Sequence, residues 1–174
     1  MGEHGPCLAC DIVAGRRAPP GGILWRSGGF ALHALADPSP LPGWLVLTSE
    51  RHARAWYDLE PGELAALGTA AAQVMAAQRS ALQAEHVYAF AIGDVLHHFH
   101  LHLVPRFAAT PERLRGRRCF DGLPEDMLPA EAVERAARLV ADSLDLGKSL
   151  APAGGEGQGE GGFTASCSPS LKLG

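Results

Sequence analysis

Four of the eight histidines in this chain of 174 residues lie between positions 97 and 102. Three of them alternate with apolar residues in the segment His98 to Val104, which reads His-Phe-His-Leu-His-Leu-Val. Successive side chains of a β-strand point to opposite faces, so the spacing predicts that His98, His100 and His102 share one face. A solvated face that happens to be rich in histidine is the alternative. Buried imidazoles need hydrogen-bond partners, and three in strict alternation favour a binding or catalytic site.

The rest of the chain divides at turn signals into segments of helical and of strand periodicity. A hairpin is predicted where Gly93-Asp94 separates the last two strands. The whole order is a short helix over 7–14, strands over 23–26, 30–35 and 44–48, a long helix over 61–82, strands over 86–92 and 98–104, and a C-terminal helix over 129–144. Such a mixture predicts an α+β fold, with an antiparallel sheet of about five strands and helices on one side.

Length and composition predict one domain over residues 1–147 and a disordered tail over 148–174. The tail is rich in Gly and Ser, has little to bury and contains Cys167. The net charge is −4, and neither a secretory signal nor a long apolar run is apparent. A soluble, cytoplasmic protein that binds neither membranes nor nucleic acid is therefore expected. The one basic run, residues 113–118, is either an exposed loop or a phosphate clamp.

Cys7 and Cys10 form a Cys-x-x-Cys pair, whose two thiolates are within reach of one metal ion. Two other interpretations are a redox dithiol and reduced cysteines without a metal. A redox pair of this kind is expected to follow a strand and to open a longer helix, and the segment before Cys7 is too short for that. The pattern therefore favours a metal site, with zinc as the ion that accepts such ligands.

The alternating histidines and the Pro105-Arg106 that follows them resemble the signature of the histidine-triad nucleotide hydrolases and transferases. Further stretches resemble that family in the same order, and the resemblance covers about residues 7–107. It implies a nucleotide substrate, no organic cofactor, and a two-fold homodimer whose sheet extends across the interface. The stretches that carry it are Cys7 to Gly15, Pro42-Gly43-Trp44-Leu45-Val46-Leu47, Arg51-His52 and Asp58-Leu59.

The resemblance also implies roles for individual residues, with His98, His100 and His102 forming the catalytic site. His100 attacks the α-phosphorus of a nucleotide ester, anhydride or phosphoramidate and forms a covalent nucleotidyl-histidine, since a neutral imidazole is nucleophilic near pH 7. His102 binds the phosphate oxygens and stabilises their charge. A structural zinc ion is implied as well, and the ligands carried over for it are Cys7, Cys10, His52 and His98.

The chain departs from the family pattern at two substrate-binding positions. Many members have Gln and Ser four and three residues before the first histidine, where this chain has Asp94 and Val95. The acidic residue that usually binds the ribose aligns with Ala36, with Asp37 adjacent. Asp37 and Asp94 are therefore the predicted substrate-binding residues, with Asp94 either a proton donor or only the cap of a turn.

The sequence is also compatible with two other functions. The missing Gln and Ser favour a nucleotide-binding or regulatory module with weak or no turnover. A metal-dependent hydrolase would instead use the three histidines to bind a catalytic ion. Asp94 is the one carboxylate near them in the sequence, and this shortage makes the metal-dependent hydrolase the less favoured interpretation.

Overall fold

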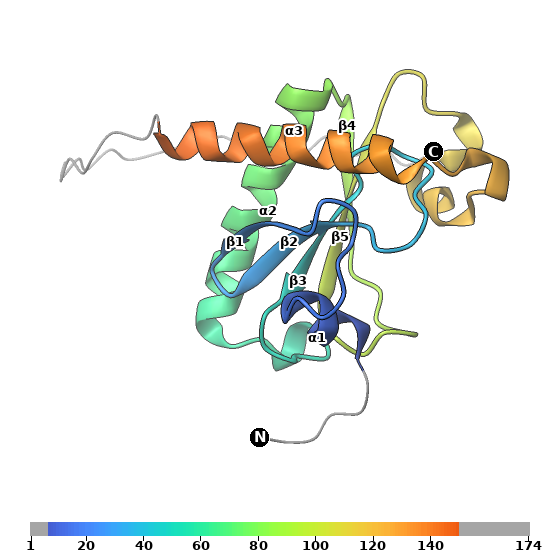
Figure 1. The fold of residues 1–174 in the computed structure, drawn as a ribbon. Helices are drawn as coiled ribbons and strands as arrows, with labels where there is room; N and C mark the ends of the chain where they lie inside the picture. The colour runs from blue at the N-terminus through green and yellow to red at the C-terminus, as the bar shows by residue number, and fades with distance from the viewer. Residues whose placement is uncertain (1–6, 150–174) are drawn as a thin grey trace, which may run out of the picture.

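A single antiparallel sheet with two long helices on one face forms the computed structural model, which describes residues 7–149 (Figure 1). The strands lie in the order β1-β2-β3-β5-β4, and each pairs antiparallel with its neighbours. The predicted α+β fold is thereby confirmed. The strands are β1 (Ile23–Ser27), β2 (Phe30–Ala34), β3 (Leu45–Ser49), β4 (His86–Phe90) and β5 (His100–Arg106), and the helices are α1 (Leu8–Val13), α2 (Pro61–Leu82) and α3 (Ala130–Ser149).

Helices α2 and α3 cover the same face of the sheet and cross each other there (Figure 1). α2 packs against β4 and β5, whereas α3 packs against β1 and β2. Leu101 and Leu103 of β5 belong to the core under these helices. Because side chains alternate along a strand, His100 and His102 lie on the opposite face. The same core contains Phe30, Leu32, Leu45 and Leu47 from the sheet, and Leu67, Val74, Val133 and Val140 from the two helices.

Helix α2 is joined to the sheet by one buried amide. The Nε2 group of Gln78 donates to the carbonyl oxygens of Gly43, at 2.8 Å, and Leu103, at 2.9 Å. Gly43 has a φ of +73°, and a Cβ at that position would collide with the side chain of Leu82 at the end of α2. The turn before β3 therefore requires a glycine, and it places Trp44 at the start of that strand.

Strand β5 begins at His100, so the prediction that His98 belongs to the strand is wrong. β4 ends at Phe90, and residues 91–99 form a longer connection than the predicted tight turn. The chain at Phe99 bonds instead to the end of β3 and the loop after it, through Ser49 and Ala53. These backbone bonds draw the segment away from β4 before the strand pairing starts.

The connection between β5 and α3 folds into 3-10 turns. They are Glu112–Leu114, Gly116–Asp121 and Pro124–Asp126. Most of the predicted disordered tail, residues 150–174, lies outside the described residues, as does Cys167, whereas residues 148 and 149 are the last of α3. Among the helices of residues 7–149, none combines the length and the apolar character needed to cross a membrane.

Candidate functional site

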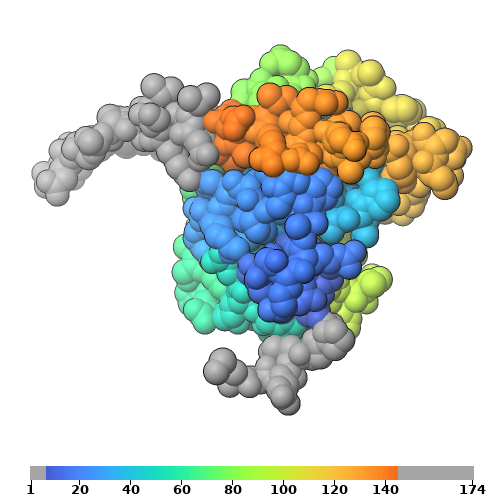
Figure 2. Space-filling model, viewed as in Figure 1, coloured from blue at the N-terminus to red at the C-terminus, as the bar shows by residue number. Residues whose placement is uncertain are grey.

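A cleft of about 530 Å³ opens on the face of the sheet that α2 and α3 leave uncovered. Three neighbouring strands form its floor, and α1, the loop before β5 and the 3-10 turns after β5 form its walls. Figure 2 shows α1 in dark blue at the surface, beside the yellow-green loop that precedes β5. The residues of the floor are His33, Val46, Thr48, His100 and His102.

His100 lies half-buried in this cleft with one ring nitrogen held by the backbone. Its Nδ1 lies 2.6 Å from the carbonyl oxygen of His98, and a carbonyl only accepts, so Nδ1 carries the hydrogen. In the neutral ring the lone pair then belongs to Nε2. The backbone thus sets the tautomer that a nucleophilic imidazole needs.

His102 is held in the opposite tautomer by Trp44. The indole Nε1–H of Trp44 donates to Nδ1 of His102 over 3.1 Å, so the hydrogen of the neutral His102 ring sits on Nε2. Burial, together with the nearby His100 and His33, lowers the pKa of His102 to about 4. The ring is therefore neutral at pH 7, and its centroid lies 5.0 Å from that of His100.

His33 and Thr48 form a second polar pair on the floor. Nδ1 of His33 donates to the carbonyl of Ala34 over 2.7 Å, and its Nε2 accepts the Thr48 hydroxyl over 2.9 Å. His33 is only 3% exposed, and burial lowers its pKa. Neighbouring strands bring these residues together, since His33 pairs with Val46 of β3, and Val46 pairs in turn with His102 of β5.

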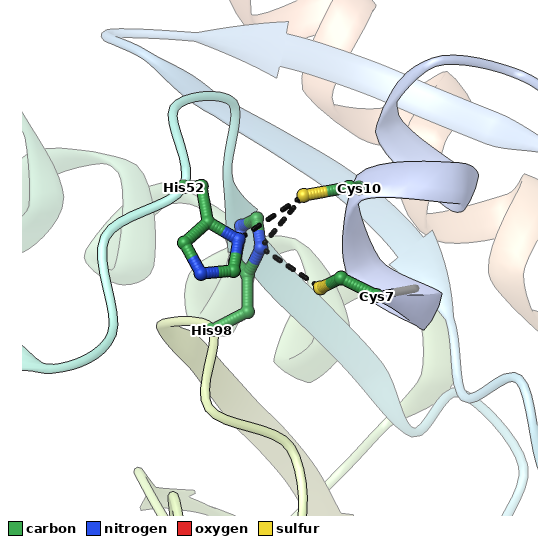
Figure 3. Close-up of side chains that lie close together, drawn as sticks. All are labelled: Cys7, Cys10, His52 and His98. Carbon is green, nitrogen blue, oxygen red and sulfur yellow. Dashed lines mark hydrogen bonds between the residues drawn. The ribbon is translucent and has the colours of Figure 1, made fainter. Parts of the chain in front are cut away.

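A second cluster lies beside the cleft and brings together Cys7, Cys10, His52 and His98 (Figure 3). One ligand atom from each of the four lies within 4.8 Å of the others. The Sγ–Nδ1 distances are 3.5 Å from Cys7 to His98, 3.4 Å from Cys10 to His98 and 3.2 Å from Cys10 to His52. Zn–S and Zn–N bonds of ordinary length at tetrahedral angles place S and N about 3.6 Å apart. The four side chains therefore match the donor set and the size of a zinc site.

Three segments of the chain position these ligands. Cys7 and Cys10 are three residues apart at the start of α1, so they share one face of the helix, and His52 lies in the loop after β3. The Nε2–H of His98 donates to the carbonyl of Ser49 over 2.8 Å, which leaves its Nδ1 lone pair for a metal. Burial and the neighbouring thiol of Cys7 raise the pKa of Cys10 to about 11 in the absence of a cation.

No protein-family model matches the sequence, and no curated protein matches it either. Solved structures do match. A Hit-like protein involved in cell-cycle regulation from Bartonella henselae aligns with a TM-score of 0.64 at 14% identity, over 82% of this chain and 99% of that one. A zinc-bound histidine triad family protein from Mycobacterium smegmatis gives a TM-score of 0.65 at 20% identity, over 83% and 97% of the two chains. A hypothetical histidine triad nucleotide-binding protein from Sulfolobus tokodaii gives 0.64 at 19% identity, over 82% and 94%.

The chain has the histidine-triad fold.

Within this histidine-triad fold, the three alternating histidines divide between two environments. His100 and His102 line the cleft, whereas the ring of His98 is fully buried at the cysteine cluster. The three rings therefore do not surround one point, and among the described residues the cysteine cluster is the one group arranged to hold a metal ion. This geometry disfavours a hydrolase that binds a catalytic ion through all three histidines.

The two predicted substrate-binding carboxylates both line the cleft. Asp37 lies in the loop after β2, Asp94 lies in the loop before β5, and both are exposed. The basic run does not line the cleft. Its arginines pair with nearby acids, as Arg113 does with Asp126 and Arg118 does with Glu112. This favours the exposed loop over the phosphate clamp.

Three residues that contribute to the cleft are not predicted by the sequence. His33 is a lone histidine in an apolar strand, and Trp44 resembled the family only as part of a longer stretch. Phe120, in the 3-10 turns, packs edge-on against both rings, with centroids 4.9 Å from Trp44 and 5.4 Å from His102. The only available signal was the position of Trp44 directly after the Pro-Gly turn, because the other contacts depend on strand pairing and on an irregular loop.

Proposed function

We propose that this protein is a nucleotide hydrolase or nucleotidyl transferase that cleaves its substrate at the α-phosphate through a covalent nucleotidyl-histidine. The observation that carries the proposal is the Nδ1 hydrogen bond from His100 to the carbonyl of His98, which leaves Nε2 as a lone pair on a residue of the cleft. The neighbouring Nε2–H of His102 is a donor for a non-bridging phosphate oxygen. A nucleotide ester, anhydride or phosphoramidate is the proposed class of substrate.

Binding of the nucleotide is proposed to use both ends of the cleft. The side chains contributed by α1 are apolar, among them Leu8 and Ile12, and an apolar wall suits the face of a base. Asp37 is proposed to accept hydrogen bonds from the ribose hydroxyls, and Asp94 to contact the substrate beside the phosphate. His98 contributes to catalysis indirectly, through its carbonyl.

We further propose that the Cys7–Cys10–His52–His98 cluster binds a structural zinc ion. The donor set, the distances and the hydrogen bond from His98 to Ser49 support this assignment. The ion holds α1 against the sheet, and no step of the reaction passes through it. No organic cofactor is proposed.

The proposal extends to the assembly of the protein. A cytoplasmic homodimer is expected, with the sheet continued across the two-fold axis. β1 and β4 are the outer strands of the sheet, and an outer strand offers backbone groups that pair with a second copy.

Labelled substrates test the proposed reaction. The protein is incubated with nucleoside 5′-monophosphate esters, anhydrides and phosphoramidates that carry ³²P at the α-phosphate, and is then quenched and digested. Mass spectrometry is expected to find the nucleotidyl group on His100. His100→Ala should abolish both turnover and labelling while the circular dichroism spectrum is retained, and His86→Ala, which changes an exposed histidine of β4, is the matched control. Turnover retained in His100→Ala would exclude this mechanism.

A second candidate function is a nucleotide-binding module without turnover. Asp94 and Val95, in place of the family's Gln and Ser, favour it, because neither supplies the amide or hydroxyl that those residues offer. Micromolar binding of a nucleoside monophosphate, with no cleavage and no labelled His100 across the whole substrate panel, would support the binding module and reject the enzyme.

A further inference from the structure

The cleft contains very few side-chain hydrogens that a substrate can use. Trp44 donates its indole hydrogen to His102, and His100 donates its Nδ1 hydrogen to the carbonyl of His98. Both hydrogens are directed into the protein. Two groups remain that face the cleft: the Nε2 lone pair of His100 and the Nε2–H of His102.

The second polar pair on the floor, His33 and Thr48, also directs its hydrogens to acceptors inside the protein. The Thr48 hydroxyl donates to Nε2 of His33, and Nδ1 of His33 donates to the carbonyl of Ala34. Thr48 is 1% exposed and His33 is 3% exposed. Each polar hydrogen of this pair already has an acceptor, so neither residue can protonate a substrate without breaking a buried hydrogen bond.

The other polar side chains of the cleft are acceptors or weak donors. Asp37 and Asp94 are exposed carboxyl groups, which only accept when they are ionised. Burial raises the pKa of the Cys119 thiol to about 11, and a thiol is a weak hydrogen-bond donor. Among the side chains that line the cleft, the Nε2–H of His102 is therefore the one strong donor without a partner inside the protein. The phosphate needs that donor.

The loop that leads into His100 at the start of β5 adds few hydrogen-bond donors to the cleft. The loop before β5 contributes Ile92, Val95 and Leu96, together with Asp94. Val95 is 98% exposed, so its isopropyl group faces solvent and the mouth of the cleft. A leaving group that emerges on this side meets aliphatic side chains and one carboxyl group.

From this distribution of hydrogens we infer that the cleft selects substrates whose leaving group departs as a stable anion, namely the carboxylate of an acyl anhydride or the phosphate of a phosphoanhydride. The inference rests on the proposed function and names its substrate class. As the bond between phosphorus and Nε2 of His100 forms, the bond to the leaving oxygen breaks and its electron pair departs with that oxygen. A carboxylate or a phosphate carries this pair without gaining a proton, whereas an alcohol or an amine must be protonated.

The second half of the cycle needs no side-chain acid either. Water attacks phosphorus, the bond between phosphorus and nitrogen breaks, and its electron pair returns to Nε2 of His100. One proton of the water is released to solvent and the nucleoside monophosphate leaves. Nδ1 of His100 keeps its hydrogen, which stays hydrogen-bonded to the carbonyl of His98 throughout, so the same tautomer is ready for the next substrate.

Aryl esters of one nucleotide test the inference, because they differ only in the leaving group. The p-nitrophenyl and phenyl esters of AMP and of GMP are mixed with excess protein, and the release of the phenol is followed in a single turnover. General acid catalysis is worth roughly 10²–10⁴-fold, so without it the p-nitrophenyl ester is expected to react at least about 100-fold faster than the phenyl ester. Acetyl adenylate, whose leaving group is a carboxylate, should likewise react far faster than a phosphoramidate of AMP, whose leaving group is an amine.

A single substitution provides the second arm of the test. Val95→Ser adds a hydroxyl at an exposed position and should accelerate the phenyl ester more than the p-nitrophenyl ester, while Val95→Ala should leave their ratio as it is. Equal rates for the two esters in the wild type, or an equal effect of Val95→Ser on both, would overturn the inference and leave the covalent mechanism standing. No phenol release and no labelled His100 with any ester would reject the proposed function, and the inference with it.

Discussion

His98 accepts the Nδ1 hydrogen of His100 on its backbone carbonyl, while its own ring lies in the cysteine cluster. One residue therefore connects the two sites. α1 makes a second connection, because it carries Cys10 on one face and presents Ile12 to the cleft on another. A change in the cluster is expected to reach the cleft along both routes, although none of the four cluster residues lines the cleft.

Removal of zinc should therefore destabilise the fold and reduce activity together. An ion that binds only the folded state contributes about 4 kcal/mol when its concentration is 1,000 times its Kd. Elemental analysis is expected to find one zinc per chain, and both chelation and Cys10→Ser should lower the free energy of unfolding by an amount of that order. Cys119→Ala, which changes a cysteine outside the cluster, should keep the metal. A metal-free wild type of normal stability would contradict this prediction.

Trp44→Phe is expected to release His102 from its tautomer. A net hydrogen bond is worth about 1 kcal/mol, so labelling of His100 should slow by roughly fivefold, and ¹⁵N NMR should show part of the His102 population with its hydrogen on Nδ1. Trp44→His keeps a ring N–H and should restore both readouts in part. An unchanged ¹⁵N spectrum in Trp44→Phe would show that the indole does not control the tautomer.

Stability should fall as the pH decreases from 7 towards 4, because His102 resists protonation in the folded state. The unfolded chain binds a proton near pH 6.5, whereas the folded chain binds it only near the lowered pKa of about 4. Between those values the unfolded state holds more protons, so the free energy of unfolding declines as the pH falls, by about 3 kcal/mol in total.

Denaturant titrations at several pH values can isolate this contribution. Between pH 6.5 and 4, the free energy of unfolding of His102→Gln should depend less steeply on pH than that of the wild type. The difference in slope should correspond to close to one bound proton, since glutamine still accepts the hydrogen bond from Trp44 but does not titrate. His86→Gln, at an exposed position on β4, is the control. Parallel curves for the wild type and His102→Gln would mean that His102 is not held neutral.

Asp37→Ala tests recognition of the sugar. If the carboxylate accepts from the ribose hydroxyls, the variant should bind a ribonucleoside monophosphate about tenfold more weakly, in line with one lost hydrogen bond to an exposed group. A 2′,3′-dideoxynucleotide should bind both proteins equally, as measured by isothermal titration calorimetry. Asp94→Ala changes the other carboxylate of the cleft and should leave the ribose preference in place.

Features with a short sequence period could be predicted from the sequence. Alternation along β5 correctly placed His100 and His102 on one face and Leu101 and Leu103 on the other. In a strand, the face to which a side chain points depends only on whether its residue number is odd or even. The four residues of the metal cluster, carried over by the family resemblance, do lie together.

The features that could not be predicted depend on contacts between distant residues. His98 leaves the strand because its neighbour Phe99 bonds to Ser49 and Ala53, which no local pattern reveals. The position of Trp44 beside His102 follows from the pairing of β3 with β5. Phe120 reaches the cleft from 3-10 turns, whose short irregular sequences carry no period.

The cleft is expected to be sensitive to substitution of the glycine before β3, although this residue does not line the cleft. Gly43 has a positive φ, lies against Leu82 and accepts a hydrogen bond from Gln78. A side chain at position 43 would push the neighbouring Trp44 away from His102. A variant of this kind would leave the residues of the cleft and the metal ligands unchanged and still weaken the hydrogen bond that sets the tautomer of His102. Loss-of-function alleles should therefore be sought at this turn as well as among the histidines.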